Sequence, residues 1–324
     1  MKVLVTGGSG FIGSNLVESL LASNHEVSIV DIKLPSIEQH NKYWFECNIL
    51  DTEKLFEIFR RISPEAVVHL AAKADVEGKT IEDYKVNTEG TKHVLDGIRK
   101  TKSVQRVVIT STQFVNQYNG TPKNDEDFAP HTVYGESKVI AEKLTRDAKL
   151  QCSWTIIRPT NIWGPWHWRY PNEFWKVIAD GKYFHPKGKN VTRSYGYVGT
   201  VAWQIQRILE IEEDKVNKQV FYVGDKPIDI LEWVNGFSRL QIGKNVRLVS
   251  PLFVKSLALF GDVLKIIGVT FPITSSRYKS MTTSNDAPMD KTFDVLGNPP
   301  YNLEENIETT VKWLKVYHPH LVKI

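Results

Sequence analysis

A tyrosine and a lysine at helical spacing are the first residues in this sequence that could do chemistry. Tyr134 and Lys138 lie in the segment YGESK, and residues four apart share one face of a helix. A charged Lys138, together with a cationic cofactor, would lower the phenol pKa from its reference value of about 10. Tyr134 would then act as a general base toward a substrate hydroxyl, or as an acid in the reverse direction. A chance surface pair is the alternative, because both residue types are common.

A run of hydroxyl residues precedes this pair in the chain. The segment VVITST at 107–112 predicts a buried strand that ends in Thr110, Ser111 and Thr112. Open parallel sheets bind their ligands at the carboxyl ends of the strands. We therefore expect Thr112 to hydrogen-bond the same substrate oxygen as Tyr134.

A glycine-rich turn lies near the start of the chain. The segment TGGSGFIG places glycines at Gly7, Gly10 and Gly13, between an expected strand and an expected helix. Gly7 would allow a tight turn, Gly10 the approach of a pyrophosphate, and Gly13 close packing of the helix on the strand. The helix N-terminus would then offer N–H groups and a partial positive charge to the phosphates. A purely structural turn is the alternative.

An acidic residue ends the next expected strand. Asp31 follows Gly13 by 18 residues, which suits a carboxylate that accepts hydrogen bonds from the adenosine ribose of a dinucleotide. The same carboxylate would repel the 2′-phosphate of NADP, although Lys33 nearby would weaken that repulsion. These features favour NAD over NADP as the cofactor.

Short β-branched runs alternate with amphipathic stretches through the first half. We expect strands at 2–6, 26–31, 66–70, 106–111 and 154–158, and helices at 12–23, 51–62, 87–100 and 134–148. This alternation predicts an α/β fold with a Rossmann-type doubly wound parallel sheet. Residues 1–160 would bind NAD and residues 161–324 would form a smaller C-terminal substrate-binding region, with part of 195–225 packing back on the first domain. Later we expect a strand near 221–224 and a helix at 303–316 capped by Asn302.

The composition narrows the class of protein without naming a reaction. Lys plus Arg number 41 against 37 Asp plus Glu, a net charge of +4 over 324 residues. So small an excess argues against a nucleic-acid partner. Cys47 and Cys152 have no metal-site spacing, so no metal is expected. A reducing cytoplasm is the expected compartment, because the apolar run after Lys2 is too short for a signal peptide.

One later segment is unusually apolar. Residues 251–269 are rich in Leu, Ile, Val and Phe, and Lys255, Asp262 and Lys265 are spaced to share one helical face. We expect a helix that packs on its own domain. A lid, a dimer contact and an interfacial membrane helix are the less favoured alternatives. A membrane-spanning helix is not expected, because it needs about 20 mainly apolar residues with few charges.

Taken in order, these segments resemble the extended short-chain dehydrogenase/reductase family, of the NAD-dependent epimerase/dehydratase type. The resemblance rests on TGGSGFIG (6–13), Asp31, HLAA (69–72), NTEGTKHVL (87–95), ITST (109–112), YGESK (134–138) and RPTNIWGP (158–165). It implies that Thr112, Tyr134 and Lys138 are catalytic, and that the helices carrying Asn87 and Tyr134 form a homodimer. Asn48 stands where the family usually has Asp. The implied NAD contacts are Gly7, Gly10, Phe11, Ile12, Gly13, Asp31, Asn48, Ile49, Ala71, Ala72, Tyr134, Lys138 and Pro159.

The second half of the chain bears on the substrate. Asn161 matches an asparagine that contacts the diphosphate in nucleotide-sugar members of the family, and Arg193 resembles an arginine that pairs with it. A surface cation is the alternative for Arg193. Lys187 and Lys189 lie just upstream and would complete a local anion site. Trp163 would stack on a base or sugar, with core packing as the equal alternative.

Departures from the family pattern limit the choice of reaction. Nucleotide-sugar dehydratases of the family have Asp-Glu after the catalytic threonine, and here those positions are Gln113 and Phe114. The segment YVGTVAW (197–203) instead resembles 3β-hydroxysteroid dehydrogenase-like members. We expect a nucleotide-sugar epimerase that works through a transient keto sugar. The alternatives are a nucleotide-sugar ketoreductase or dehydrogenase, a 3β-hydroxysteroid dehydrogenase-like enzyme, and a non-catalytic NAD-binding regulatory protein.

Overall fold

Two compact units make up the chain. The computed structural model describes residues 1–117, 120, 122–188, 190–269 and 271–324. The sheet unit comprises Met1–Ile162, Gly196–Asp225 and Ala287–Pro300, and the smaller unit comprises Trp163–Tyr195, Lys226–Asp286 and Tyr301–Ile324. The chain crosses from one unit to the other along β7 (Asn161–Trp163) and β10 (Tyr195–Tyr197).

A seven-stranded sheet forms the centre of the sheet unit, in the order β11-β6-β5-β4-β1-β2-β3. Each neighbouring pair runs parallel. Because the chain winds outward from β1 in both directions, the Rossmann-type doubly wound fold is confirmed. The strands are β1 (Lys2–Thr6), β2 (Glu26–Asp31), β3 (Trp44–Glu46), β4 (Ala66–His69), β5 (Arg106–Thr110), β6 (Ser153–Pro159) and β11 (Gln219–Val223).

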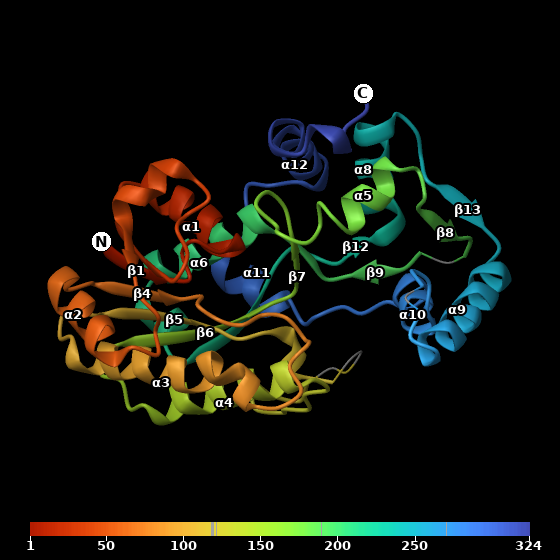
Figure 1. Cartoon of the computed structure of the whole chain (residues 1–324). Coiled ribbons are helices and arrows are strands. Elements are labelled where there is room, and N and C mark those ends of the chain that lie inside the picture. Colours follow the sequence, from red (N-terminus) through yellow and green to blue (C-terminus); the bar gives the residue numbers. More distant parts are fainter. Residues whose placement is uncertain (118–119, 121, 189, 270) are drawn as a thin grey trace. The chain divides into compact units, whose positions relative to one another are not determined.

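Helices cover both faces of this sheet (Figure 1). One face carries α2 (Thr52–Ile62), α3 (Lys85–Lys100) and α4 (Val133–Asp147). The other carries α1 (Phe11–Ala22), α6 (Val198–Glu210) and α11 (Asp290–Leu296). Ser19 on α1 donates a hydrogen bond of 2.7 Å to Gln206 on α6. Residues after 195 thus return to the sheet unit as a helix that the sequence pattern did not predict.

Aromatic packing dominates the core of the smaller unit. The fully buried Trp163 lies 5.8 Å from Trp233 and 5.5 Å from Phe237, measured between ring centroids. Asn302 caps α12 by accepting a 3.0 Å hydrogen bond from the N–H of Glu305, as expected. The elements are α5 (Phe174–Ala179), β8 (Phe184–Pro186), β9 (Thr192–Arg193), β12 (Ile228–Asp229), α8 (Ile230–Ile242), β13 (Arg247–Val249), α9 (Pro251–Ile266), α10 (Ser275–Thr282), α12 (Leu303–Tyr317) and the 3₁₀ turn η4 (Pro319–Leu321). Short elements of the sheet unit are α7 (Glu213–Val216) and the 3₁₀ turns η1 (Glu38–Tyr43), η2 (Glu82–Tyr84) and η3 (Gln113–Val115).

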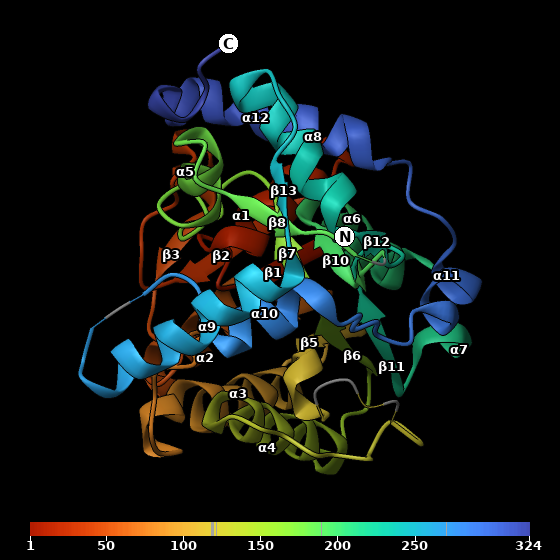
Figure 2. The same ribbon diagram turned by 90° about the vertical axis from the view of Figure 1, so that its right-hand side faces the viewer.

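The apolar helix α9 is present and packs on its own unit, as expected. Only Val254, Ala258 and Gly261 on this helix are buried. The helix packs against α10, and Figure 2 shows the two helices side by side. Most of the large apolar side chains of α9 are nevertheless exposed, which the sequence did not predict. Among the described residues, no helix is long and apolar enough to cross a membrane.

Candidate functional site

Backbone crowding explains the glycines of the turn between β1 and α1. Gly7 has φ +73°, and a Cβ there would lie 2.5 Å from the Ala71 nitrogen. A Cβ on Gly13 would lie 2.3 Å from the Gly7 carbonyl oxygen, so α1 approaches the turn as closely as glycine permits. Gly10 is exposed, and the nearest atom to its would-be Cβ is 3.2 Å away. In the part of the chain that the structure describes, no side chain caps α1, where Phe11 and Ile12 are partly exposed.

The Asp31 carboxylate is held beside this turn. Its two oxygens accept hydrogen bonds from the N–H of Ser9 at 3.1 Å and from the N–H of Lys33 at 3.0 Å. Each carboxylate oxygen has further acceptor capacity, so Asp31 can accept ribose hydroxyls as well. The Lys33 side chain is exposed.

The other expected cofactor contacts have different surroundings. The exposed Asn48 uses its side-chain oxygen to accept the N–H of Leu50 at 3.0 Å. Ile49 is buried in the sheet unit's core against Gly90 of α3. Ala71 is half-buried and its N–H donates to Thr6 at 3.4 Å, which joins the loop after β4 to the glycine turn. Ala72 is half-buried, and Pro159 is buried at the end of β6.

The hydroxyls of Thr112 and Tyr134 meet at the carboxyl end of β5. Tyr134 is 8% exposed, and burial raises its pKa to about 12, although the hydrogen bond with Thr112 opposes that rise. This direction is opposite to the one expected from the sequence, because desolvation exceeds every charge effect on the phenol. Tyr134 is therefore a protonated phenol at neutral pH in this structure.

Lys138 lies one turn further along α4 and is buried. Its ammonium donates a 2.9 Å hydrogen bond to the carbonyl oxygen of Thr110. Burial lowers its pKa to about 8, while Glu142 acts in the opposite direction. Burial lowers the pKa of His69, and the charge of Lys138 adds to that fall. Hydrogen bonds then connect the glycine turn with the helix that carries Tyr134, in the order Thr6, His69, Thr91, Asn87, Ser137 and the carbonyl oxygen of Tyr134.

Local packing fixes the start of α4. A Cβ on Gly135 would lie 2.4 Å from the carbonyl oxygen of Phe114, so the glycine in YGESK lets α4 approach η3 and brings Tyr134 to Thr112. Asn87 on α3 donates to the Ser137 hydroxyl at 3.0 Å and accepts the N–H of Lys73 at 2.8 Å. The sequence analysis used Asn87 and Ser137 only for the family resemblance and missed their role in positioning α4.

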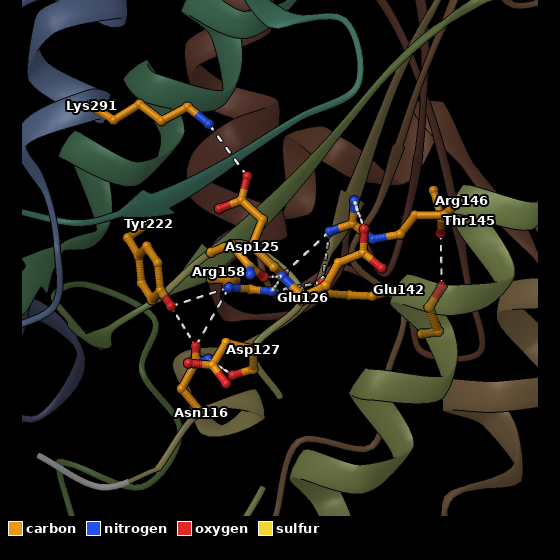
Figure 3. A network of polar contacts seen from close by, with 12 residues as sticks. Asn116, Asp125, Glu126, Asp127, Glu142, Thr145, Arg146, Arg158, Tyr222 and Lys291 are labelled. Carbon is orange, nitrogen blue, oxygen red and sulfur yellow. Dashed lines mark hydrogen bonds and ion pairs between the residues drawn. The ribbon is translucent and has the colours of Figure 1, made fainter. Parts of the chain in front are cut away.

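A buried ion pair joins α4 to β6 (Figure 3). The Arg158 guanidinium on β6 donates two 2.9 Å hydrogen bonds to the carboxylate of Glu142 on α4. Arg158 also donates to the Tyr222 hydroxyl of β11 at 3.2 Å, and that hydroxyl donates to the side-chain oxygen of Asn116. The pair is fully enclosed. It ties the helix that carries Tyr134 to β6, β11 and the segment after Thr112, and the sequence analysis missed it.

The expected substrate residues fall in different settings. Asn161 accepts a 3.3 Å hydrogen bond from Gln113, the residue after Thr112. In the smaller unit, Arg193 is buried and donates to the Ser280 carbonyl oxygen at 2.7 Å. Its expected neighbour Lys187 is exposed, and Lys189 lies outside the described residues. Trp163 is enclosed by aromatic side chains, which gives it a packing role. Within the described ranges, no group of His, Cys, Asp and Glu is placed to hold a metal ion.

Known proteins share this fold over nearly the whole chain. A 4-epimerase of N-acetyl-α-D-glucosaminyl-diphospho-ditrans,octacis-undecaprenol from Escherichia coli O157:H7 is 25% identical, over 96% of this chain and 95% of its own. A 3-β-hydroxysteroid dehydrogenase from Mycolicibacterium neoaurum is 35% identical over 50% of this chain and 48% of its own. A solved UDP-glucuronic acid 4-epimerase from Bacillus cereus, in complex with UDP-glucuronic acid and NAD, has a TM-score of 0.74. It is 20% identical and covers 98% of this chain and 100% of its own.

The family model for NAD dependent epimerase/dehydratase proteins matches residues 3–224. That range includes the glycine turn, Asp31, Thr112 and the Tyr134–Lys138 pair, the same features that the structure links by polar contacts. The chain belongs to the NAD dependent epimerase/dehydratase family.

Proposed function

We propose that this protein is an NAD-dependent nucleotide-sugar epimerase that works through a transient keto sugar, with Tyr134 as the proton-transfer residue. The observation that carries the proposal is the contact between the Thr112 and Tyr134 hydroxyls at the carboxyl end of β5, one helical turn from Lys138. Ligands of doubly wound sheets bind at this edge.

The residues around the glycine turn fit NAD. The exposed Gly10 leaves room at the N-terminus of α1 for a pyrophosphate, which the helix dipole favours. Asp31 is oriented by Ser9 and Lys33 and suits a ribose with a free 2′-hydroxyl, so we propose a preference for NAD over NADP. When bound, NAD supplies the hydride acceptor and donor that oxidation and reduction of a sugar carbon require.

The chain's own residues would handle the proton and orient the sugar. The Thr112 hydroxyl holds the phenol of Tyr134 and would share the hydrogen bonding of the reacting sugar oxygen. Tyr134 would give its proton to a keto oxygen, and would take one from a hydroxyl once a nearby positive charge lowers its pKa. Lys138 is the charged group in place for that task, anchored on Thr110. Gln113 and Phe114 supply no carboxyl group for dehydration at the positions after Thr112.

Two further assignments belong to this proposal. In the smaller unit, Arg193 is the candidate for the substrate diphosphate, and Arg193→Lys should raise KM about tenfold with little change in kcat, since lysine lacks the bidentate fork. A homodimer through α3 and α4 is proposed from the family resemblance. Light scattering after size exclusion would test it, and a monomer at all concentrations would contradict it.

A hydroxysteroid dehydrogenase-like activity is the second candidate. It is favoured by YVGTVAW (197–203) and by the relative that is 35% identical over half of this chain. A ketoreductase or dehydrogenase acting on a nucleotide sugar would also use Thr112, Tyr134 and Lys138. A non-catalytic NAD-binding protein would need none of these three residues for catalysis.

The deciding experiment begins with mass spectrometry of small molecules released from the denatured pure protein. We expect NAD among the released molecules. In assays of the protein, we expect UDP-sugars to retain their mass while their NMR spectra show inverted stereochemistry. The assay panel is UDP-glucose, UDP-N-acetylglucosamine, UDP-glucuronic acid, a polyprenyl-diphosphate N-acetylglucosamine and a 3β-hydroxysteroid. Net NADH formation with the steroid alone would replace the epimerase proposal with the dehydrogenase one. No turnover of any compound would favour the regulatory protein.

A further inference from the structure

The helix α9 exposes a continuous apolar surface, called here the apolar arc. Leu252 is 76% exposed and Ile266 is 85% exposed. At about 100° per residue, these side chains span roughly 140° of the helix circumference. The only polar side chain within the arc is Ser256, whose hydroxyl is bonded to the Leu252 carbonyl oxygen at 3.0 Å. The arc consists of Leu252, Phe253, Leu259, Phe260, Val263, Ile266 and Ile267.

The opposite side of α9 anchors the helix on its own unit. A Cβ on Gly261 would lie 2.0 Å from the Ile273 carbonyl oxygen, so the backbone there is in direct contact with the segment leading to α10. Asp262 accepts the N–H of Ser275 at 3.1 Å, at the start of α10. The buried stripe therefore holds the helix in place, and two rings at the edge of the arc add to that packing. Phe253 lies 6.4 Å from Phe184 and Phe260 lies 5.8 Å from Phe271, measured between ring centroids. Both rings remain more than half exposed.

Positive charge accompanies the arc. Lys255 is exposed on α9 just outside it, whereas Lys265 is exposed on the opposite side of the helix. The one acidic residue of the helix, Asp262, is engaged at α10. The smaller unit as a whole contains 17 Lys and Arg against 9 Asp and Glu. An apolar helical surface bordered by a lysine, on a unit with an excess of eight basic residues, is typical of helices that lie in the interface of an anionic bilayer.

The dimensions of α9 argue against the other occupants. Its 16 residues extend for roughly 24 Å, and no described helix is long and apolar enough to span a membrane. Two copies paired through one such helix would bury roughly a few hundred Å² per partner, below the ~800 Å² per partner of a standard stable interface. A bilayer surface needs no such complementary area, because lipid chains adapt to the side chains.

We propose that the apolar arc of α9 inserts into the surface of an anionic phospholipid bilayer, with the helix axis in the membrane plane. This surface lies in the smaller unit and the proposal does not depend on the reaction that the sheet unit catalyses. It assigns the exposed apolar side chains to the lipid acyl boundary and Lys255 to the lipid phosphates.

Vesicle sedimentation with the full chain tests the proposal. We expect the protein to sediment with vesicles of equal parts phosphatidylglycerol and phosphatidylcholine at low salt, and much less with pure phosphatidylcholine. The double variant Phe260→Ser/Ile266→Ser should lose at least tenfold in vesicle affinity. The matched control Val316→Ser/Ile324→Ser removes exposed apolar side chains elsewhere in the smaller unit and should sediment as the wild type does. Circular dichroism and NAD binding verify that each variant is folded.

Two results would overturn the proposal. One is equal sedimentation of the α9 double variant and the wild type, or absence of sedimentation with anionic vesicles. The other is a dimer in light scattering that Phe260→Ser/Ile266→Ser abolishes while vesicle binding is absent, which would assign the arc to a second copy of the chain. The variant Lys255→Gln should bind anionic vesicles several-fold more weakly and with a smaller salt dependence, whereas Lys265→Gln, on the opposite side of the helix, should bind as the wild type does. Equal binding by the two variants would contradict the placement of Lys255 at the lipid phosphates.

Discussion

The two units differ in what they bury and in the charge they carry. The sheet unit has 28 Asp and Glu against 24 Lys and Arg, whereas the smaller unit has an excess of eight basic residues. Enclosed charges lie around α4 of the sheet unit, with Lys138, Glu142 and Arg158 all buried. Aromatic rings around Trp163 fill the core of the smaller unit.

This difference agrees with the tasks that the proposed function gives to the two units. A proton-transfer site needs groups whose pKa values are shifted and whose positions are fixed, and buried hydrogen-bonded charges provide both. Such groups cost stability unless each one has a partner. The smaller unit bears no comparable buried ion pair among the described residues, and its packing depends on shape and apolar area.

Breaking the buried ion pair should give the largest loss of stability. Glu142→Leu would leave the Arg158 guanidinium enclosed without its carboxylate, at a cost of about 3–5 kcal/mol in the free energy of unfolding. Urea denaturation measures this loss. The double variant Glu142→Leu/Arg158→Leu should recover most of it, because no charge is then buried alone. A double variant no more stable than Glu142→Leu would show that packing, not charge pairing, holds this region.

The smaller unit should respond to loss of volume instead. Trp163→Ala would open a cavity between Trp233 and Phe237 and lower the free energy of unfolding by about 3–4 kcal/mol. Trp168, which is 68% exposed, is the matched control, and Trp168→Ala should change stability by less than about 0.5 kcal/mol. Equal effects of the two substitutions in urea denaturation would contradict the aromatic-core account.

Removing the buried lysine of α4 should stabilise the protein. The folded pKa of Lys138 is about 8, below its usual value of 10.5. Between these values the unfolded chain binds more protons, so the wild type gains stability as pH rises through that window. Lys138→Met should therefore be about 1–2 kcal/mol more stable at pH 7, after loss of the bond to Thr110.

That gain should disappear near pH 10, where the wild type no longer buries a charge. Thermal unfolding of both proteins at pH 7 and pH 10 measures the difference. A gain of the same size at both pH values would mean that burial of the ammonium charge is not its cause.

Helix caps should show the smallest effects and should separate the units by function. Thr132 caps α4 through the N–H of Gly135 at 3.0 Å, and Asn302 caps α12 through the N–H of Glu305 at 3.0 Å. Either residue changed to Ala should cost about 0.5–1 kcal/mol in stability. Only Thr132→Ala should also lower kcat, because α4 carries Tyr134. Equal kcat values in the two variants would mean that the start of α4 tolerates displacement.

Local patterns predicted the first 160 residues better than the rest of the chain. The strands at 2–6 and 26–31 agree with the structure, and so does the cap at Asn302 in the smaller unit, because each depends on residues close together in the chain. The helix α6 of the sheet unit and the helix α8 of the smaller unit were missed, since the surfaces on which they pack come together only in the folded chain. The pair of Glu142 with Arg158 joins a helix to a strand and has no local signature.

Burial also determines two properties that the spacing of residues in the sequence does not predict. The pKa of Tyr134 rises instead of falling, because the phenol is enclosed beside Tyr84 as well as Thr112. The apolar character of α9 was evident from the sequence, but which of its side chains remain exposed depends on α10.

The most direct test compares UDP-sugar epimerisation by the wild type and Tyr134→Phe, with NAD binding measured in parallel. The phenylalanine keeps the ring and removes only the hydroxyl that contacts Thr112. We expect the rate of product formation, followed by NMR, to fall by about 10²–10⁴-fold, with NAD affinity within about twofold of the wild type. An epimerisation rate that survives the substitution would contradict the assignment of proton transfer to Tyr134.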